Sequence, residues 1–293
     1  MTRRYVGREL SDTDLDTVRA ICADPAHPTR AAIAREVCRA LAWTRPNGAL
    51  KDMSAKVALA RMAADGLITL PAPRTRQGRP RRHLEATIEA GPEISCSLHH
   101  LGDIHINTVT GAQRAASATW NEMIGRFHYL GYTPASGAQI RYLATTNTGA
   151  PIAAISFAAA AWALEDRDNW IGWDREARQA RLHLVVGNPR FLVAPWVRVP
   201  HLASHLLATT CHRLRDDWQA RYGYKPVLVE TFVETGRHRG TCYQAANWTR
   251  VGATKGRGKL DRYNTHALPV KDIYLYPLRR DFRRHLTAPL NPA

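Results

Sequence analysis

Two side chains in the last third of the chain have the types and the setting that acid–base chemistry requires. Glu230 lies in an apolar stretch, residues 226–234, that is typical of a buried strand, and Tyr243 lies in a short segment, residues 241–248, that favours a helix. A positioned carboxylate or phenol can remove or supply a proton on a bound substrate. We therefore predict Glu230 and Tyr243 as candidate catalytic residues, although both also suit buried residues whose hydrogen bonds are structural.

A buried Glu230 requires a partner for its charge. An ionised carboxylate removed from water needs a cation or a cluster of donors, or its pKa rises until the group becomes neutral. The candidate partners along the chain are Arg141, Arg190, Tyr243 and Lys255. The arrangement of the strands decides which of them reaches the carboxylate.

A turn rich in glycine and basic residues follows at residues 252–259. It contains Lys255, Arg257 and Lys259, but it is not a Walker A loop, because the lysine spacing is wrong and no Ser or Thr follows. These side chains are predicted either to contact a phosphate backbone or to form an ordinary basic hairpin turn.

Histidines and carboxylates elsewhere give weaker indications of metal chemistry. His201 and His205 are one helical turn apart, but no glutamate completes a His-Glu-x-x-His pattern. Asp103 and His105 would share one face of a strand, as would Glu230 and Glu234, and the four groups together could form a metal-dependent centre that cuts or joins DNA. The sequence assigns neither a metal nor a cofactor.

The chain carries 41 Lys and Arg against 25 Asp and Glu, which gives a formal charge of +16 and a pI near 10.2. Such an excess attracts polyanions, and nucleic acid is the usual one. An arginine-rich proteome would give a similar balance, so the clustering of the charges matters. The runs are Arg74, Arg76, Arg79, Arg81 and Arg82; Arg250, Lys255, Arg257, Lys259 and Arg262; and Arg279, Arg280, Arg283 and Arg284.

Composition also indicates the compartment. The five cysteines include no Cys-x-x-Cys pair, which suits reduced thiols. No apolar leader follows the N-terminus, and no apolar run reaches the roughly 18 residues that span a membrane. We expect a cytoplasmic protein that has nucleic acid, most favourably DNA, as a partner and makes no membrane contact.

Residues 1–72 have the pattern of a winged helix-turn-helix domain. Ser11 begins a first helix in a capping-box pattern, Thr29 can cap a second helix, and Gly66 can end a third. A strand is expected to begin at Leu67. Domains of this kind place a recognition helix in the major groove of DNA. The alternative is a small helical domain that binds protein.

The third helix is the predicted recognition helix. Its inward side chains are expected to be Leu50, Met53, Val57 and Met62. The side chains expected to face DNA are Lys51, Ser54, Ala58 and Arg61. Five arginines around a turn at Gln77-Gly78 are expected to form a wing that contacts phosphate: Arg74, Arg76, Arg79, Arg81 and Arg82.

Residues 73–95 are expected to contain the wing and a linker, and residues 96–293 a mixed α/β domain, so the fold class is α+β. Strands are expected at 101–109, 139–145, 151–159, 182–194 with a break at Asn188-Pro189, 226–234, around 251, and 273–278. Helices are expected at 115–130, 200–222 and 241–248. The loose alternation of strands and helices favours a central mixed sheet with helices on both faces.

Several motifs resemble those of the DruA family. They include His128-Tyr-Leu-Gly-Tyr132, Arg167-Asp-Asn-Trp-Ile-Gly-Trp173, Asn188-Pro-Arg-Phe-Leu192, Glu230-Thr-Phe-Val233 and Gly240-Thr-Cys-Tyr243. DruA proteins belong to Druantia anti-phage defence systems, and their relatives are often associated with transposases. The resemblance covers nearly the whole chain. It implies a role in phage defence or mobile-element biology, beside partner proteins such as a helicase, and it assigns no catalytic residue.

Residues 139–278 more loosely resemble the acetyltransferase-like (GNAT) fold. In that fold Tyr243 would stand where a tyrosine commonly protonates the leaving thiolate, and Glu230 where a strand offers a general base. Residues 197–203 would match the loop that holds the pyrophosphate of coenzyme A, but they lack its glycines. Three functions stay open: a DNA-binding component of a defence system, a metal-dependent DNA-cutting or DNA-joining enzyme, and an acyltransferase.

Overall fold

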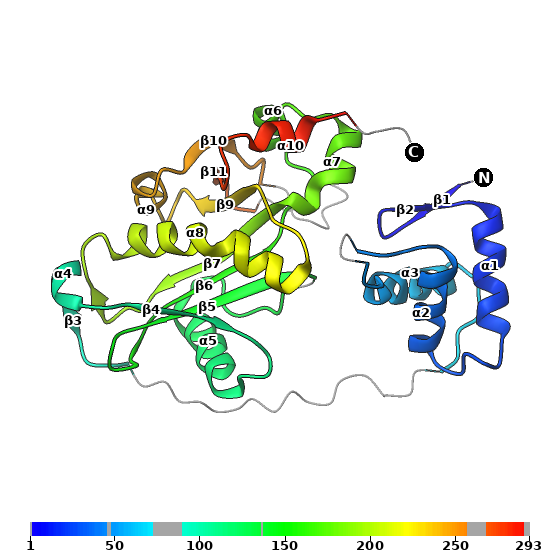
Figure 1. Cartoon of the computed structure of the whole chain (residues 1–293), viewed down its shortest axis with the longest axis horizontal. Coiled ribbons are helices and arrows are strands. Elements are labelled where there is room, and N and C mark those ends of the chain that lie inside the picture. Colours follow the sequence, from blue (N-terminus) through cyan, green and yellow to red (C-terminus); the bar gives the residue numbers. More distant parts are fainter. Residues whose placement is uncertain (1, 46–47, 73–89, 136, 257–267, 290–293) are drawn as a thin grey trace. The chain divides into compact units, whose positions relative to one another are not determined.

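The computed structural model describes residues 2–45, 48–72, 90–135, 137–256 and 268–289 (Figure 1). The chain divides into two compact units, unit 1 (residues 1–83) and unit 2 (residues 84–293). Among the described residues, every helix is too short or too polar to cross a bilayer.

Unit 1 contains a β-hairpin and three helices. Its elements are β1 (Arg3–Tyr5), β2 (Arg8–Leu10), α1 (Asp12–Ala23), α2 (Arg30–Ala40) and α3 (Asp52–Ala64). The capping box predicted at Ser11 is formed: its hydroxyl accepts from the Asp14 N–H at 3.1 Å, and the Asp14 carboxylate accepts from the Ser11 N–H at 2.9 Å. Thr29 caps α2 as predicted, and Gly66, with φ +72°, follows α3. The local signals for these helix ends are therefore confirmed.

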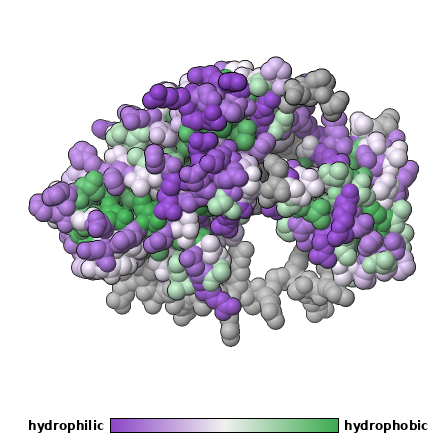
Figure 2. Space-filling model, viewed as in Figure 1, coloured by the Kyte–Doolittle hydropathy of each residue, from purple (hydrophilic) through white to green (hydrophobic). Residues whose placement is uncertain are grey.

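The exposed face of α3 differs from the prediction. Met53 and Val57, expected to face inward, are 60% and 42% exposed, whereas Ala58, expected to face DNA, is fully buried. Apolar side chains consequently reach the surface of unit 1 among hydrophilic ones (Figure 2). The buried face consists of Ala55, Ala58, Leu59 and Met62, at the i, i+3, i+4 and i+7 spacing of one helix face. The strand expected from Leu67 was also wrong, because residues 67–72 form none.

Unit 2 is built on a seven-stranded mixed sheet (Figure 1). Its strands are β4 (His105–Val109), β5 (Gln139–Thr145), β6 (Pro151–Ala159), β7 (Val185–Val193), β9 (Leu228–Glu234), β10 (Thr249–Ala253) and β11 (Lys271–Pro277). The order across the sheet is β10-β11-β9-β7-β6-β5-β4. The pairs are antiparallel except that β7 and β9 run parallel. The predicted mixed sheet is confirmed.

Helices cover both faces of this sheet. The remaining elements are β3 (Ile94–Ser95), α4 (Leu98–Leu101), α5 (Arg114–Phe127), α6 (Glu165–Ile171), α7 (Arg175–Arg181), the 3-10 helix η1 (Leu182–Leu184), β8 (Val197–Arg198), α8 (Leu202–Tyr222), α9 (Thr241–Ala245) and α10 (Phe282–Thr287). On β5 the Tyr142 hydroxyl donates to Asp217 of α8 at 2.8 Å, whereas the neighbouring Arg141 donates to Asn121 of α5 at 2.9 Å. Because successive strand residues point to opposite faces, α8 and α5 lie on opposite sides of the sheet.

Strand β9 separates two hydrophobic cores. Val233 belongs to the core beneath α8, and Phe232 packs against a second core formed with α6, α7 and α10. By the same alternation Thr231 faces Tyr243 of α9, whereas Glu230 faces Arg167 of α6.

One strand boundary differs from the prediction, and one predicted irregularity is present. The strand expected from Leu101 begins at His105, because Ser97 caps the short helix α4 through the His100 N–H. The break expected at Asn188-Pro189 is present as a β-bulge within a continuous β7. Between the pair Ser156 and Arg190 and the pair Ala158 and Gly187, β7 has two residues, Asn188 and Pro189, where β6 has only Phe157.

Candidate functional site

The parallel strands β7 and β9 diverge within the sheet. They pair from Val185 opposite Leu228 to Gly187 opposite Glu230, after which β7 continues beside β6 and β9 beside β11. Open α/β sheets place ligands outside the carboxyl ends of parallel strands at points where the strand order changes. Both candidate catalytic residues lie close to this divergence.

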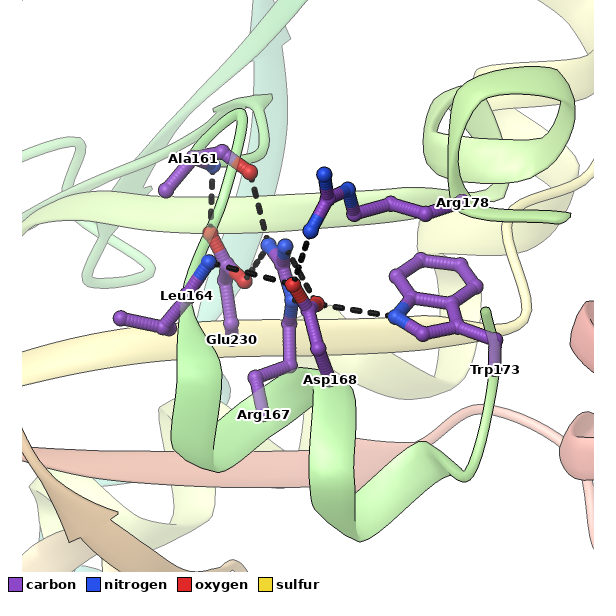
Figure 3. Close-up of polar contacts among 7 residues, drawn as sticks. All are labelled: Ala161, Leu164, Arg167, Asp168, Trp173, Arg178 and Glu230. Atoms are coloured by element: carbon purple, nitrogen blue, oxygen red, sulfur yellow. Dashed lines mark hydrogen bonds and ion pairs between the residues drawn. The ribbon is translucent and has the colours of Figure 1, made fainter. Parts of the chain in front are cut away.

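Glu230 is completely buried, and both of its carboxylate oxygens are engaged (Figure 3). One oxygen accepts from Nη1 of Arg167 at 2.7 Å, and the other accepts from the Ala161 N–H at 2.6 Å. Arg167 is equally buried and also donates to the Ala161 carbonyl at 2.8 Å. Figure 3 shows its guanidinium between Glu230 and Asp168.

Asp168 and Arg178 complete a network of two carboxylates and two guanidiniums, the Glu230 network. Asp168 accepts from Arg167 at 2.9 Å, from Arg178 at 2.7 Å and from the Trp173 indole at 2.9 Å. Burial raises the pKa of Glu230, and the charge of Arg167 opposes this. Burial also acts to raise the pKa of Asp168, but Arg167 and the donated hydrogen bonds outweigh it and the pKa is lowered. The arrangement is that of a structural ion-pair network.

The predicted partners of Glu230 were wrong. Its cation is Arg167, whereas Arg141 reaches α5 and Arg190 donates to the Gly131 carbonyl at 3.0 Å. Arg167 lies 63 residues before Glu230 on α6, an element whose position beside β9 no local pattern indicates.

Tyr243 lies in a neutral network beneath α8. Its hydroxyl donates to the Asn188 side-chain oxygen at 2.9 Å and lies 3.5 Å from the Thr231 hydroxyl. Its ring stacks on Tyr274 with centroids 5.9 Å apart and packs edge-on against Trp248. Burial raises the pKa of Tyr243, so its phenol keeps its proton at neutral pH.

Gly240 sets the position of the helix that carries Tyr243. It precedes α9 with φ +68°, and a Cβ there would lie 2.5 Å from the Tyr274 hydroxyl. Only glycine combines this backbone conformation with so close an approach. The turn therefore presses α9 and Tyr243 against the sheet.

The structure does not bring Glu230 and Tyr243 together. Glu230 and Thr231 are successive residues on β9, so their side chains leave opposite faces, and Tyr243 contacts Thr231. One substrate atom cannot touch both side chains through the strand. The described residues also contain no cluster of three or more His, Cys, Asp or Glu that could hold a metal ion.

The residues predicted to bind nucleic acid have different surroundings. On α3, Arg61 is exposed, and Lys51 and Ser54 are partly buried. Burial, with Arg45 nearby, lowers the pKa of Lys51. Lys255 is exposed and pairs with Glu165 at 2.5 Å. Outside the described residues lie Arg74, Arg76, Arg79, Arg81, Arg82, Arg257 and Lys259.

A group of aromatic and cationic side chains was not predicted. This Tyr129 cluster consists of His128, Tyr129, Arg190, Arg237 and His238. His128 stacks on Tyr129 with centroids 5.0 Å apart, and the Arg237 guanidinium lies 5.3 Å from the same ring. The available signal was the adjacent aromatic pair of the His128-Tyr-Leu-Gly-Tyr132 motif, but its partners come from distant segments.

Comparison with known families and structures supplies the remaining findings. The family model of Druantia protein DruA matches residues 63–268, more than half of the chain. A comparison with curated proteins gave no match. A GNAT-family acetyltransferase from Streptococcus pneumoniae has 14% identity and a TM-score of 0.38, covering 60% of this chain and 99% of that one. The spermidine N-acetyltransferase from Vibrio cholerae in complex with CoA and spermine has 9% identity and a TM-score of 0.37, covering 60% and 95%. No activity follows from similarity at this level.

Proposed function

The chain belongs to the DruA family, and on that premise we propose that it is a cytoplasmic DNA-binding component of a bacterial anti-phage defence system. The family description supports the defence role, because it names Druantia. The observation that carries DNA binding is the clustered positive charge of the chain.

The longest arginine cluster lies at the end of the unit 1 sequence. Residues 73–84 contain five arginines and no acidic residue. A segment of this kind suits phosphate oxygens on any sequence, and binding through it releases counterions and weakens steeply with salt. We propose that these arginines contact the DNA phosphates and position the protein on the duplex without reading its sequence.

Unit 1 is proposed to act as a winged helix, with the arginine segment as its wing. The exposed face of α3 carries Met53, Val57 and Arg61 at i, i+4 and i+8. Apolar side chains can contact thymine methyl groups in the major groove, and arginine can bind guanine. This face replaces the one predicted around Ala58.

The proposal gives no chemistry to Glu230 or Tyr243. Both side chains are buried in networks that use their polar atoms internally. Any reaction of the defence system on DNA is then expected from a partner protein, such as a helicase or a nuclease.

The test is DNA binding by the full chain and by a variant with Arg79, Arg81 and Arg82 replaced by alanine. Fluorescence anisotropy would measure the affinity for labelled duplexes of several sequences at a series of salt concentrations from low to moderate. We expect weaker binding to every sequence and a slope of log affinity against log salt that is smaller by roughly 2 to 3.

The matched control replaces three exposed arginines of unit 2 by alanine, Arg198, Arg221 and Arg280, and removes the same charge. It should keep most of the wild-type slope. Equal slopes for the wild type and the Arg79, Arg81 and Arg82 variant would reject the arginine segment as a DNA contact, and a wild-type chain that binds no duplex would reject the proposal.

A further inference from the structure

The Tyr129 cluster carries more positive than negative charge. Glu234 pairs with Arg237 at 2.9 Å. Arg190 donates instead to two backbone carbonyls, those of Gly131 at 3.0 Å and Pro189 at 2.8 Å. Neutral carbonyls orient a guanidinium without cancelling its charge, so Arg190 leaves a positive potential at the carboxyl end of the divergence between β7 and β9.

His128 is buried beside these charges. Burial, with the charges of Arg190 and His238, lowers the pKa of His128 to about 4. Its Nδ1 accepts from the Leu130 N–H at 3.2 Å, which a neutral ring can do. At neutral pH His128 is therefore an uncharged flat ring stacked on Tyr129.

The same segment exposes large side chains. Tyr129, Leu130 and Tyr132 are 38%, 42% and 40% exposed. The Arg237 guanidinium already lies over the Tyr129 ring, although its side chain is 58% exposed and can leave. Guanidinium groups and nucleobases are both flat and both stack on aromatic faces, so an unpaired base can take the place of the guanidinium.

We propose that the Tyr129 cluster binds an unpaired base of a single-stranded nucleic acid. The base stacks on Tyr129, and the neighbouring phosphate meets Arg190 and the displaced Arg237. This combination of an aromatic platform and cations is how proteins hold single strands with little sequence preference. In a duplex the bases are already stacked, so this site should discriminate against double strands. The site lies wholly in unit 2 and does not depend on duplex binding by unit 1.

The experiment measures the affinity of the full chain for labelled single strands of twelve thymidines or twelve uridines and for a labelled duplex. Tyr129→Ala should weaken binding to single strands by about 5- to 150-fold and leave duplex binding unchanged. Tyr129→Phe, which keeps the ring, should bind as the wild type does. Arg237→Gln should reduce the salt slope on single strands by about 0.7, the value for one phosphate contact.

Trp162→Ala is the matched control. Trp162 is also an exposed aromatic residue, at 51%, but it follows β6 at the end of the sheet where β7 and β9 begin. Its loss should leave single-strand binding unchanged. A preference for uridine or thymidine strands would support the site and identify the strand that it holds.

Several results would overturn the proposal. The first is a wild-type chain that binds neither single strand. The second is a Tyr129→Ala protein that melts like the wild type and binds single strands as tightly as the wild type does. The third is a Tyr129→Ala protein that loses affinity equally for single strands and for the duplex. A partner protein on this face would give the second result. Failure of the duplex proposal is distinguishable, because it appears only in the duplex measurements and in the Arg79, Arg81 and Arg82 variant.

Discussion

The Glu230 network and the Tyr129 cluster lie beside the same sheet but differ in their balance of positive and negative side chains. In the network two carboxylates face two guanidiniums at 2.7 to 2.9 Å, and Arg167 and Glu230 are completely buried. In the cluster Arg237 pairs with Glu234, whereas Arg190 donates to neutral backbone carbonyls, and an aromatic ring reaches solvent. A charge that is balanced internally holds elements together, whereas an excess beside an exposed ring can bind an anion from outside.

The first prediction tests the structural role of the Glu230 network and has the largest expected effect. Glu230→Gln removes the charge that faces Arg167 and leaves the buried guanidinium with Asp168 as its remaining counter-charge. We expect the free energy of unfolding to fall by about 3 kcal/mol, as when one partner of a buried ion pair is removed. Urea denaturation followed by tryptophan fluorescence measures this.

Two further variants sharpen that measurement. Glu165→Gln makes the same chemical change in the exposed pair with Lys255 and should leave stability unchanged. Arg167→Met combined with Glu230→Leu removes both charges, leaves Asp168 paired with Arg178, and should cost less stability than either single variant. Glu230→Gln protein with wild-type stability and no phage protection in cells would instead restore the catalytic interpretation.

The second prediction tests the neutral network on the opposite face of β9. Tyr243→Phe removes the donor to the Asn188 oxygen in a buried site. The expected loss is about 1 to 2 kcal/mol, the cost of leaving one buried acceptor unpaired. Thermal and urea unfolding measure it, with Tyr132→Phe at a 40% exposed ring as the control.

Phage protection below the melting temperature separates the two roles of Tyr243. If the Tyr243 hydroxyl has only a structural role, cells that express the Tyr243→Phe variant should remain protected at temperatures where the variant is folded. Unchanged stability with lost protection would show that the phenol transfers a proton.

Some of this architecture follows from local patterns and some requires the folded chain. The bounds of β5 and β6 and the caps at Ser11 and Thr29 were predicted, because alternation and capping depend on neighbours in sequence. The inner face of α3 was missed because Ala55 and Ala58, which are small and only weakly apolar, form it.

The partners of the site residues could not be predicted in the same way. Arg167 meets Glu230 only because α6 packs against β10 and β11, next to β9, and the ring of Tyr129 meets Arg237 from a loop more than a hundred residues later. Such pairings depend on strand order, which periodicity leaves undetermined. Glycine at residue 240 likewise makes sense only once Tyr274 lies against it.

The third prediction concerns the titration of His128 in the Tyr129 cluster, where burial is the larger cause of the lowered pKa and the charges of Arg190 and His238 add to it. His128 has a folded-state pKa of about 4, whereas an unfolded histidine titrates near 6.5. Above about pH 6.5 His128 is neutral in both the folded and the unfolded chain and does not change the free energy of unfolding. As the pH falls towards 4, the unfolded chain takes up a proton that the folded chain rejects, so stability is lost in this window.

The wild type should therefore lose about 1 to 2 kcal/mol more than His128→Asn between pH 7 and pH 4.5, a value reduced for partial solvent screening. Asparagine does not titrate, and its oxygen can accept from the Leu130 N–H. Other groups titrate in both proteins, so the difference between their urea-unfolding profiles isolates His128. Parallel profiles would show that neither burial nor the neighbouring charges lower the pKa of His128. A bound strand of twelve thymidines brings negative charge to Arg190 and should narrow the difference, which ties this titration to the proposed single-strand site.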